Sequence, residues 1–583
     1  MATEVQSLLA IDIGATNTKV NLFDIVGGRY RFISYGEAPS TAGAPLFDIG
    51  EGIWEAIAAL ERKSHRKIIS EEGALIAPST PENTGVDLVV ATMSAGKPLK
   101  VLAVGLQQDV SLQAAEQLAA TTYARVVDTI SLNDRRSESE RINLIAQTRP
   151  EVILMAGGTN DGASRSLLNL IEVVGLASYL QDESHKPHVL YIGNEELHSE
   201  VKSSLSRITD LHLAPNILPL VGSKTLYPAQ KEYFSIFKEV RKKQSSGISQ
   251  LLSWTNGQFA SSATAISRVV RFLSKKYEPD KGVLGVDLGS QSTVFSAAFD
   301  GEEALRVFPY LGMGTGSPAV LERSSLGKIT RWLPTAIPES RVEDYLHQKY
   351  LYPASVPTEP GELALEHALA RQVLRIAVKE GLKFLPDGAR QTQPDLLPLV
   401  EPIIGSGKVL TEAPSRAHST LILLDGLQPT GVTTLALDQN GLLPALGAVS
   451  PHSPLLAVQV IESSTFLNLG TVIAPVGYAR PGTPILRMQI QREDGRRSTR
   501  EIKYGSLMVL PTHQGEKVTL HLRPLHGFDV GMGGPGRSGR VSAVGGALGV
   551  IIDARGRPLQ FSSDPERNQK RNQQWLKILQ KFE

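Results

Sequence analysis

Two aspartates, each followed two positions later by a glycine, are the residues of this chain best suited to hold a metal ion beside a phosphate. Asp12 lies in the stretch LLAIDIGATNTKVNLFDI, and Asp287 lies in GVLGVDLGSQSTVFSAAFDG. In both stretches an apolar run of strand length precedes the aspartate, and small polar residues and a second alternating run follow it. Carboxylate oxygens suit hard divalent cations, and a glycine turn can direct backbone N–H groups toward an anion. Each stretch is therefore predicted to be a β-hairpin that binds a phosphate and its cation.

The two hairpins together predict two similar half-molecules that face each other across one nucleotide. Asp12 and Asp287 are the predicted metal ligands and catalytic carboxylates, and they are expected to act mainly through the water molecules of Mg²⁺, which gives up its hydration shell reluctantly. The alternative interpretation is two ordinary hairpins without a ligand. The predicted phosphate-binding residues are Gly14, Ala15, Thr16, Asn17, Thr18 and Lys19 in the first hairpin and Gly289, Ser290, Gln291 and Ser292 in the second.

Two further glycine turns are candidates for binding a ligand. The segment PIIGSGKVL contains Gly405, Ser406, Gly407 and Lys408 after a short apolar strand, and a glycine backbone can approach a nucleoside closely because no Cβ intervenes. The segment AGGTNDG follows another apolar strand and leads to a helix. It is either a phosphate-binding turn or a tight connection without a ligand. If it faces the nucleotide, Asp161 is a catalytic candidate that would orient a water molecule or a substrate hydroxyl.

The order of apolar patterns predicts an α/β protein of several units, because the chain is too long for a single core. Strands alternate with helices after residue 97, which indicates a parallel sheet, whereas short strands dominate after residue 451. The predicted units are a first domain at 1–96 with 222–280, an inserted α/β unit at 97–221, a second domain at 281–450, and a β-rich C-terminal domain with a terminal helix at 451–583.

The composition excludes several classes of function. The formal net charge is +1, with 60 Lys and Arg against 59 Asp and Glu, so electrostatics predict neither a nucleic acid nor a membrane as the main partner. Cysteine is absent, which excludes disulfides, thiolate metal sites and a cysteine nucleophile. We see neither a signal peptide nor a run of about 20 apolar residues. A soluble, cytoplasmic protein is expected.

The order of these motifs resembles a known family. The two aspartate hairpins are similar to the phosphate loops of the actin, sugar-kinase and heat-shock-chaperone ATPases, and the Gly405–Lys408 turn is similar to their adenosine-binding turn. Together with VILMAGGTNDG and LLDGLQPTGVTTLALDQNGLLPALGA, they resemble the glutamate mutase L family over roughly residues 8–449. The resemblance implies two ribonuclease-H-like (actin-like ATPase) domains with ATP and Mg²⁺ between them. It also implies a chaperone or reactivating factor for an adenosylcobalamin-dependent mutase.

Three classes of function remain open at this point. The first is the ATP-driven mutase chaperone, for which slow ATP hydrolysis is expected. The second is a small-molecule kinase, which needs a base directed at a substrate hydroxyl, and Asp161 is the available candidate. The third is an actin-like structural protein that assembles into homo-oligomers or filaments. Phosphoryl transfer to a small molecule would identify the second class, and ATP-dependent filaments would identify the third.

Overall fold

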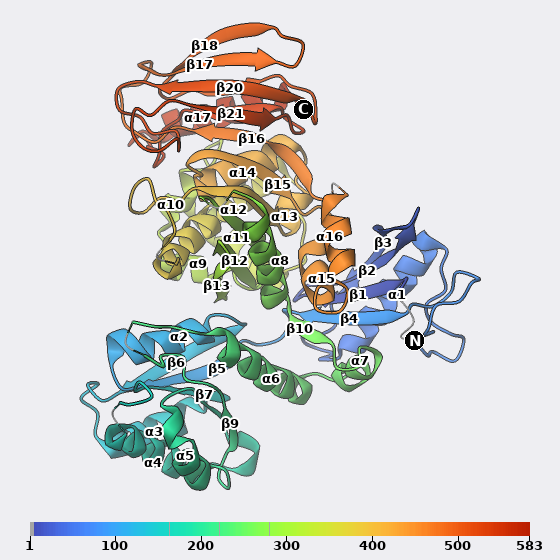
Figure 1. Ribbon diagram of the computed structural model, residues 1–583, viewed down its shortest axis with the longest axis vertical. Coiled ribbons are helices and arrows are strands. Elements are labelled where there is room, and N and C mark those ends of the chain that lie inside the picture. The colour runs from blue at the N-terminus through green and yellow to red at the C-terminus, as the bar shows by residue number, and fades with distance from the viewer. Residues whose placement is uncertain (1–4, 163, 221, 279, 387, 464) are drawn as a thin grey trace.

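The computed structural model describes residues 5–162, 164–220, 222–278, 280–386, 388–463 and 465–583. The predicted first and second domains are called the first and the second lobe from here on. Figure 1 shows the second lobe in the centre and the first lobe beside it. The inserted unit lies on one side of the two lobes, and the C-terminal strands lie on the opposite side. The predicted boundaries at residues 1 and 221 fall outside the described residues. Within the described residues, no helix has both the length and the apolar character that a membrane span requires.

The first lobe is built on a five-stranded sheet with the order β10-β4-β1-β2-β3. The first three strands form an antiparallel meander, and β4 and β10 add to it in parallel with β1. Helix α1 begins at its cap Asp48, whose side chain accepts a hydrogen bond from the N–H of Gly50. The elements are β1 (Leu8–Ile13), β2 (Asn17–Val26), β3 (Arg29–Pro39), α1 (Ile49–Ser64), β4 (Leu88–Met93) and β10 (Phe259–Ser261).

The second lobe repeats this arrangement of strands. Its sheet begins β13-β12-β11-β14-β15, again an antiparallel meander followed by two parallel strands. The shared order confirms the predicted pair of ribonuclease-H-like domains. The elements are β11 (Gly282–Leu288), β12 (Ser292–Phe299), β13 (Glu302–Pro309), α9 (Ala319–Arg323), α10 (Leu326–Thr330), α11 (Glu339–Leu351), α12 (Pro360–Gly381), β14 (Val400–Ser406), α13 (Lys408–Thr411), α14 (Arg416–Leu427) and β15 (Gly431–Leu437).

Two helices that follow the last strand of each lobe join the lobes. Helix α8 (Ser262–Lys276) follows β10, and α15 (Leu442–Val449) follows β15. They approach so closely that a Cβ on Gly447 would lie 1.8 Å from the backbone oxygen of Ala265. A glycine is therefore required at this crossing for steric reasons. Helix α16 (Pro454–Glu462) follows α15 and packs near β3.

The inserted unit is a parallel sheet with the order β6-β5-β7-β8-β9, which is the flavodoxin-like strand order. It also touches the second lobe, because the N–H of Val307 on β13 donates to the carbonyl of Ala120 at 2.7 Å. The elements are β5 (Leu99–Gly105), α2 (Gln113–Ala119), β6 (Ala124–Ser131), α3 (Glu138–Thr148), β7 (Val152–Ala156), α4 (Arg165–Tyr179), β8 (His188–Tyr191), α5 (His198–Leu205) and β9 (Asp210–Leu213). Helices α6 (Tyr227–Gln244) and α7 (Ile248–Trp254) lead back to the first lobe.

The C-terminal strands divide between two sheets, which alternation alone did not predict. Strands β16 (Leu467–Ala474), β22 (Val550–Asp553) and β19 (Leu507–Leu510) extend the sheet of the second lobe beyond β15. A separate antiparallel sheet has the order β18-β17-β20-β21. Its strands are β17 (Pro484–Arg492), β18 (Arg497–Lys503), β20 (Lys517–Pro524) and β21 (Gly539–Val544). The β-rich segment is thus continuous with the second lobe, and residue 450 does not separate independent sheets.

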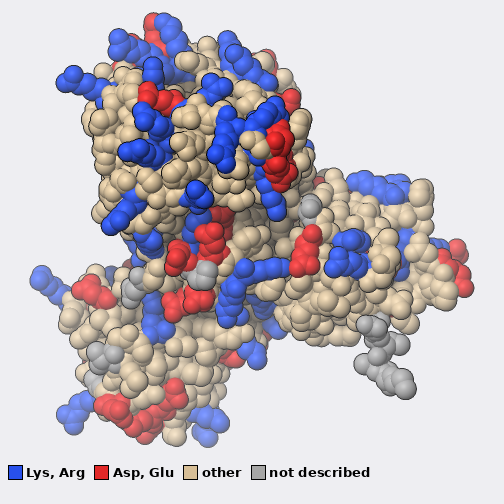
Figure 2. All heavy atoms as spheres, turned by 45° about the horizontal axis from the view of Figure 1, so that its top comes forward, with Lys and Arg blue, Asp and Glu red and all other residues tan. Residues whose placement is uncertain are grey.

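Charge and packing distinguish the two sides of this C-terminal unit. Figure 2 shows many Lys and Arg side chains over its outer surface, and Arg487, Arg500 and Arg523 of the four-stranded sheet are exposed. On the inner side, helix α17 (Pro565–Gln580) packs on the second lobe, where the side-chain amide of Asn572 donates to the carbonyl of Arg331 at 3.0 Å. The terminal helix therefore docks on this protein.

Candidate nucleotide site

The two aspartate hairpins line one cavity of about 690 Å³ between the lobes. Residues from both lobes meet there, so the two predicted half-molecules face each other across this cavity. Of the predicted site residues, those in the lining are Asp12, Gly14, Ala15, Thr16, Asn17, Lys19, Asp287, Gly289, Ser290, Gln291, Ser292, Ser406, Gly407 and Lys408.

The two hairpins have the same backbone conformation at the turn. The N–H of Gly14 donates to the carbonyl of Asn17 at 2.9 Å, and the N–H of Gly289 donates to the carbonyl of Ser292 at 3.0 Å. A Cβ on Gly14 would lie 2.7 Å from the oxygen of Asn17, and one on Gly289 would lie 2.8 Å from the oxygen of Ser292. Both glycines are therefore required by the turn itself, because a side chain would collide with the carbonyl that closes it.

The aspartates of the two hairpins are held by corresponding neighbours. Asp12 lies opposite Thr92 on β4 and accepts hydrogen bonds from the hydroxyls of Thr92 at 2.6 Å and Ser262 at 2.7 Å. Asp287 lies opposite Ser406 on β14, whose side chain also hydrogen-bonds to it. Parallel strands bring these side chains to the same edge of each sheet. The hydroxyls orient the carboxylates toward the cavity and offset part of the cost of burying them.

A third aspartate, Asp438, completes the acidic group and was not predicted. It follows β15 directly, is fully buried and lines the cavity. Its two oxygens accept hydrogen bonds from the N–H groups of Leu442 and Leu443 at 2.8 Å each, which caps helix α15. The sequence did contain a signal, because Asp438 follows the apolar run TTLAL as Asp12 follows LLAI.

The cavity is strongly acidic, and the aspartates influence one another. Burial, followed by the charges of Asp12 and Asp438, raises the pKa of Asp287 to about 7. Burial also raises the pKa values of Asp12 and Asp438, while hydrogen bonds and Lys19 oppose the shift. Three clustered carboxylates with raised pKa values form a site that a cation would stabilise.

Two basic residues of the cavity, Lys408 and Lys19, connect the two lobes. Lys408 of the second lobe forms an ion pair of 2.5 Å with Glu37 on β3 of the first lobe. Burial would lower the pKa of Lys408, but its contacts with Glu37 raise it overall. Lys19 extends from the first lobe to the turn of the second, where a Cβ on Gly441 would lie 3.4 Å from its Nζ. Burial lowers the pKa of Lys19, and Glu37 and Asp438 oppose that shift.

In the Gly405–Lys408 turn, a glycine is required for packing within the protein. Gly407 has a φ of +102°, and a Cβ there would lie 2.3 Å from the carbonyl oxygen of Leu288 on the neighbouring strand β11. The glycine thus permits close packing against the second aspartate hairpin. Contact of this backbone with a nucleoside stays a prediction.

Three predicted site residues do not line the cavity. Thr18 is fully buried, because strand alternation directs Asn17 and Lys19 toward the cavity and Thr18 to the other face. Gly405 packs under the turn, close to Leu423. Asp161 is exposed in the inserted unit and is not among the residues of the cavity.

The inserted unit nevertheless contributes a residue beside the acidic group. Tyr123 immediately precedes β6 and is buried. Its pKa is raised well above the usual value, first by burial and then by the charges of Asp287 and Asp12. The charges of both hairpin carboxylates, one from each lobe, therefore act on this side chain of the inserted unit, which is not itself among the residues that line the cavity. No motif in the sequence marked it.

The match to a protein family covers most of the chain. The model of the family described as "MutL protein" matches residues 8–465. The chain belongs to this MutL family. It is 23% identical over 406 residues to Protein MutL of Clostridium tetanomorphum, an alignment that covers 64% of this chain and 85% of that protein. The predicted membership of the glutamate mutase L family is confirmed.

Solved structures resemble this MutL family chain weakly over much of its length. A nucleotide-free acetone carboxylase has a TM-score of 0.32 at 12% identity and covers 86% of this chain and 82% of its own. Xylulose kinase from Bifidobacterium adolescentis has a TM-score of 0.28 at 11% identity, with coverages of 80% and 96%. A glycerol dehydratase reactivase has a TM-score of 0.28 at 10% identity, with coverages of 72% and 95%.

Proposed function

We propose that this protein binds ATP with Mg²⁺ between its lobes and uses the nucleotide to switch between two arrangements of them, as a chaperone or reactivating factor for an adenosylcobalamin-dependent mutase. The observation that carries the proposal is the pair of hairpins with the same turn hydrogen bond, one from each lobe, on either side of one acidic cavity. The mutase as client follows from the family, and ATP and Mg²⁺ follow from the chemistry of the hairpins.

In this proposal the residues of the cavity divide the work of binding MgATP. The hairpin backbones from Gly14 and from Gly289 onward, with their hydroxyl and amide side chains, donate to the phosphates. Asp12, Asp287 and Asp438 orient the water molecules around Mg²⁺, which prefers to retain several of them. Lys19 provides positive charge toward the phosphates. The Mg²⁺ in turn neutralises the carboxylates, whose mutual repulsion Lys19 alone offsets only in part.

The small-molecule kinase is less well supported than the switch. It needs a base within reach of a substrate hydroxyl, and Asp161, the base named for that role, is exposed in the inserted unit and is not among the cavity residues. ATP hydrolysis would need an oriented water in addition to the metal. Slow turnover is therefore the expectation for this chain.

Calorimetric titration with ATP and Mg²⁺ tests the binding step. We expect the wild-type chain to release or take up heat on titration, and Asp12→Ala to lose the Mg²⁺-dependent part of the affinity, because it removes one of the carboxylates that orient the metal's waters. Asp161→Asn is the control and should bind as the wild type does, since Asp161 is not among the cavity residues. Absence of heat and of a thermal shift at millimolar MgATP would contradict the proposal.

Small-angle X-ray scattering with and without nucleotide tests the switch. The γ-phosphate and its cation would contact both hairpins at once, so their loss removes contacts from both lobes and favours an open arrangement. The α8–α15 crossing at Gly447 and the Lys408–Glu37 pair are the interlobe contacts about which the lobes would move. We expect a smaller radius of gyration with MgATP than with MgADP or no nucleotide.

The same experiment has outcomes that separate binding from switching. Identical scattering curves in the ATP, ADP and empty states would refute the hinge even if calorimetry detects binding.

The client is tested separately, by co-purification from the native host. Mutase subunits should accompany the chain in one nucleotide state and leave it in the other. The basic outer face of the C-terminal sheet and the inserted unit are the proposed contact surfaces.

A further inference from the structure

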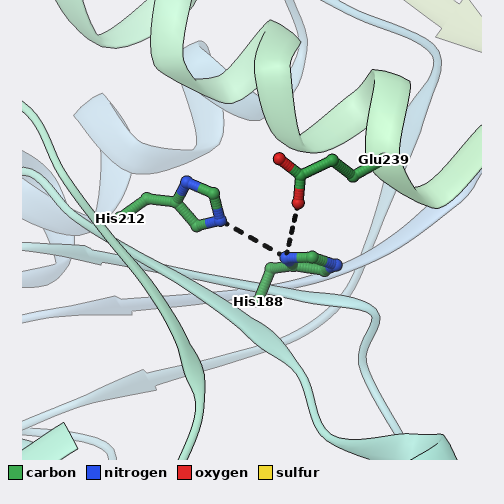
Figure 3. Close-up of side chains that lie close together, drawn as sticks. All are labelled: His188, His212 and Glu239. Carbon is green, nitrogen blue, oxygen red and sulfur yellow. Dashed lines mark hydrogen bonds and ion pairs between the residues drawn. The ribbon is translucent and has the colours of Figure 1, made fainter. Parts of the chain in front are cut away.

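A group of metal-ligating side chains lies far from the nucleotide cavity, between the inserted unit and helix α6. His188 begins β8, His212 lies on the adjacent strand β9, and Glu239 lies on α6, which covers this part of the sheet. Their ligand atoms all lie within 4.8 Å of one another, and this is the one such group among the residues that the structure describes. Figure 3 shows the imidazole of His212 and the carboxylate of Glu239 both directed at Nδ1 of His188.

The distances match the edges of a tetrahedral metal site. Nδ1 of His188 lies 3.4 Å from Nε2 of His212 and 3.8 Å from a carboxylate oxygen of Glu239. Zn²⁺ binds imidazole nitrogen at about 2.0–2.1 Å with tetrahedral geometry, so two of its ligands lie about 3.4 Å apart. A small shift of the Glu239 side chain, which is half exposed, would close the longer edge.

The tautomer of His212 is fixed in the form that a metal needs. Its Nδ1 lies 2.9 Å from the carboxylate of Glu232, which lies about two turns before Glu239 on the same face of α6. The N–H at Nδ1 donates to this carboxylate, which leaves the lone pair of Nε2 directed at the centre of the group. A carboxylate that orients a ligating histidine through its second nitrogen is the usual outer shell of zinc sites.

His188 is prepared in the same way by its burial. Its side chain is only 4% exposed, so the surrounding packing fixes the orientation of the ring. Its Nε2 has no hydrogen-bond partner among the described residues. The nitrogen that faces His212 and Glu239, and that would bind the metal, is Nδ1. A carboxylate oxygen of Asp210 also lies 3.7 Å from Nδ1 of His188. The same oxygen lies 3.9 Å from Nζ of Lys243, so Asp210 is assigned to that ion pair and not to the metal.

We infer that His188, His212 and Glu239 bind a divalent transition metal, Zn²⁺ by ligand preference, through two imidazole nitrogens and one carboxylate oxygen, with water as the fourth ligand. The metal crosslinks strands β8 and β9 to helix α6. Because α6 leads from the inserted unit back to the first lobe, the metal fixes the orientation of the unit relative to that helix. This site is independent of the nucleotide cavity.

Titration of the chelator-treated full-length chain with Zn²⁺ and Co²⁺, without nucleotide, tests the inference. The wild-type chain should bind one equivalent, show the visible absorption of tetrahedral Co²⁺, and unfold at a higher temperature with Zn²⁺ than without it. His212→Gln and Glu239→Gln each remove a ligand and should abolish the Co²⁺ spectrum and the thermal shift. Glu232→Gln should weaken metal affinity by about 10- to 100-fold, because it removes the orienting carboxylate.

The controls make the outcome decisive. His185→Gln changes an exposed histidine of the same unit and should bind Zn²⁺ as the wild type does. Glu239 is half exposed, so Glu239→Gln serves if His212→Gln does not fold. The inference is overturned if the wild type binds no Zn²⁺ at micromolar free metal. It is also overturned if Glu239→Gln and the wild type bind equally, which would leave His188 and His212 as a simple hydrogen-bonded pair.

Discussion

Asp287→Asn is expected to stabilise the nucleotide-free protein and at the same time to abolish most of its affinity for MgATP. Burial and the charges of Asp12 and Asp438 raise the pKa of Asp287 from 3.8 to about 7. A shift of this size corresponds to at most about 4 kcal/mol of destabilisation by the charged carboxylate, and the water-accessible cavity reduces that figure. Asparagine has no charge to bury. It also cannot compensate a cation, which should cost about 2–5 kcal/mol of binding free energy.

The difference in free energy of unfolding between the wild type and Asp287→Asn should depend on pH. A carboxylate whose pKa is raised on folding binds more protons in the folded state between pH 4 and 7, so its contribution to stability falls as the pH rises through that range. The wild type and Asp287→Asn should therefore have similar free energies of unfolding near pH 4, and the variant should be increasingly more stable toward pH 8. Denaturant unfolding at several pH values, without metal, measures this difference.

Asp300→Asn is the matched control for this prediction. Asp300 lies at the exposed turn between β12 and β13 of the same lobe, with a φ of +47° that asparagine also adopts readily. It should change neither stability nor affinity for MgATP appreciably. If Asp287→Asn were less stable than the wild type at pH 8, the repulsion among the three aspartates would not be the dominant effect of that carboxylate.

Local pattern predicted the parts of the site that local geometry determines. An apolar run, a glycine turn and a second alternating run are sufficient to define each aspartate hairpin, and Asp12 and Asp287 occupy the same position in two similar sheets. The repeated strand order of the lobes follows from the same signals. Because the sequence contains two such hairpins, it also predicted that they face each other across one site.

Residues brought together by distant packing could not be predicted in this way. Asp438 acquires its place because β15 lies beside β14, and Lys408 reaches Glu37 only once the lobes face each other. The charges of Asp287 and Asp12 act on Tyr123 only once the inserted unit packs beside the lobes. His188, His212 and Glu239 do not form a recognisable metal-binding motif in the sequence. They come together only when helix α6, which carries Glu239, packs against the sheet that carries the two histidines. Asp161 had a suitable local context but is exposed in the inserted unit and is not among the cavity residues.

The same limitation applies to a buried group of charged side chains in the C-terminal segment and the second lobe. Asp553 ends β22 and accepts hydrogen bonds from Arg555 at 2.8 Å and from Arg557 at 2.6 Å. Arg555 also donates to Asp425 on α14 at 2.7 Å, and Asp425 accepts from Arg371 on α12 at 2.8 Å. These five side chains are buried and connect the C-terminal segment to the helices of the second lobe.

Asp553→Ala is expected to lower the free energy of unfolding by about 3–5 kcal/mol, because it leaves the guanidinium groups of Arg555 and Arg557 buried without their carboxylate. Burial alone would raise the pKa of Asp553, but these two arginines lower it well below the usual range. The stabilisation by Asp553 is therefore present above pH 4 and is lost only as the pH falls toward the lowered pKa. Asp494→Ala, which removes an exposed pair with Arg496, is the control and should change stability little. Denaturant unfolding at neutral pH measures both variants, and equal midpoints would show that the arginines find other partners and that this ionic group does not hold the C-terminal segment in place.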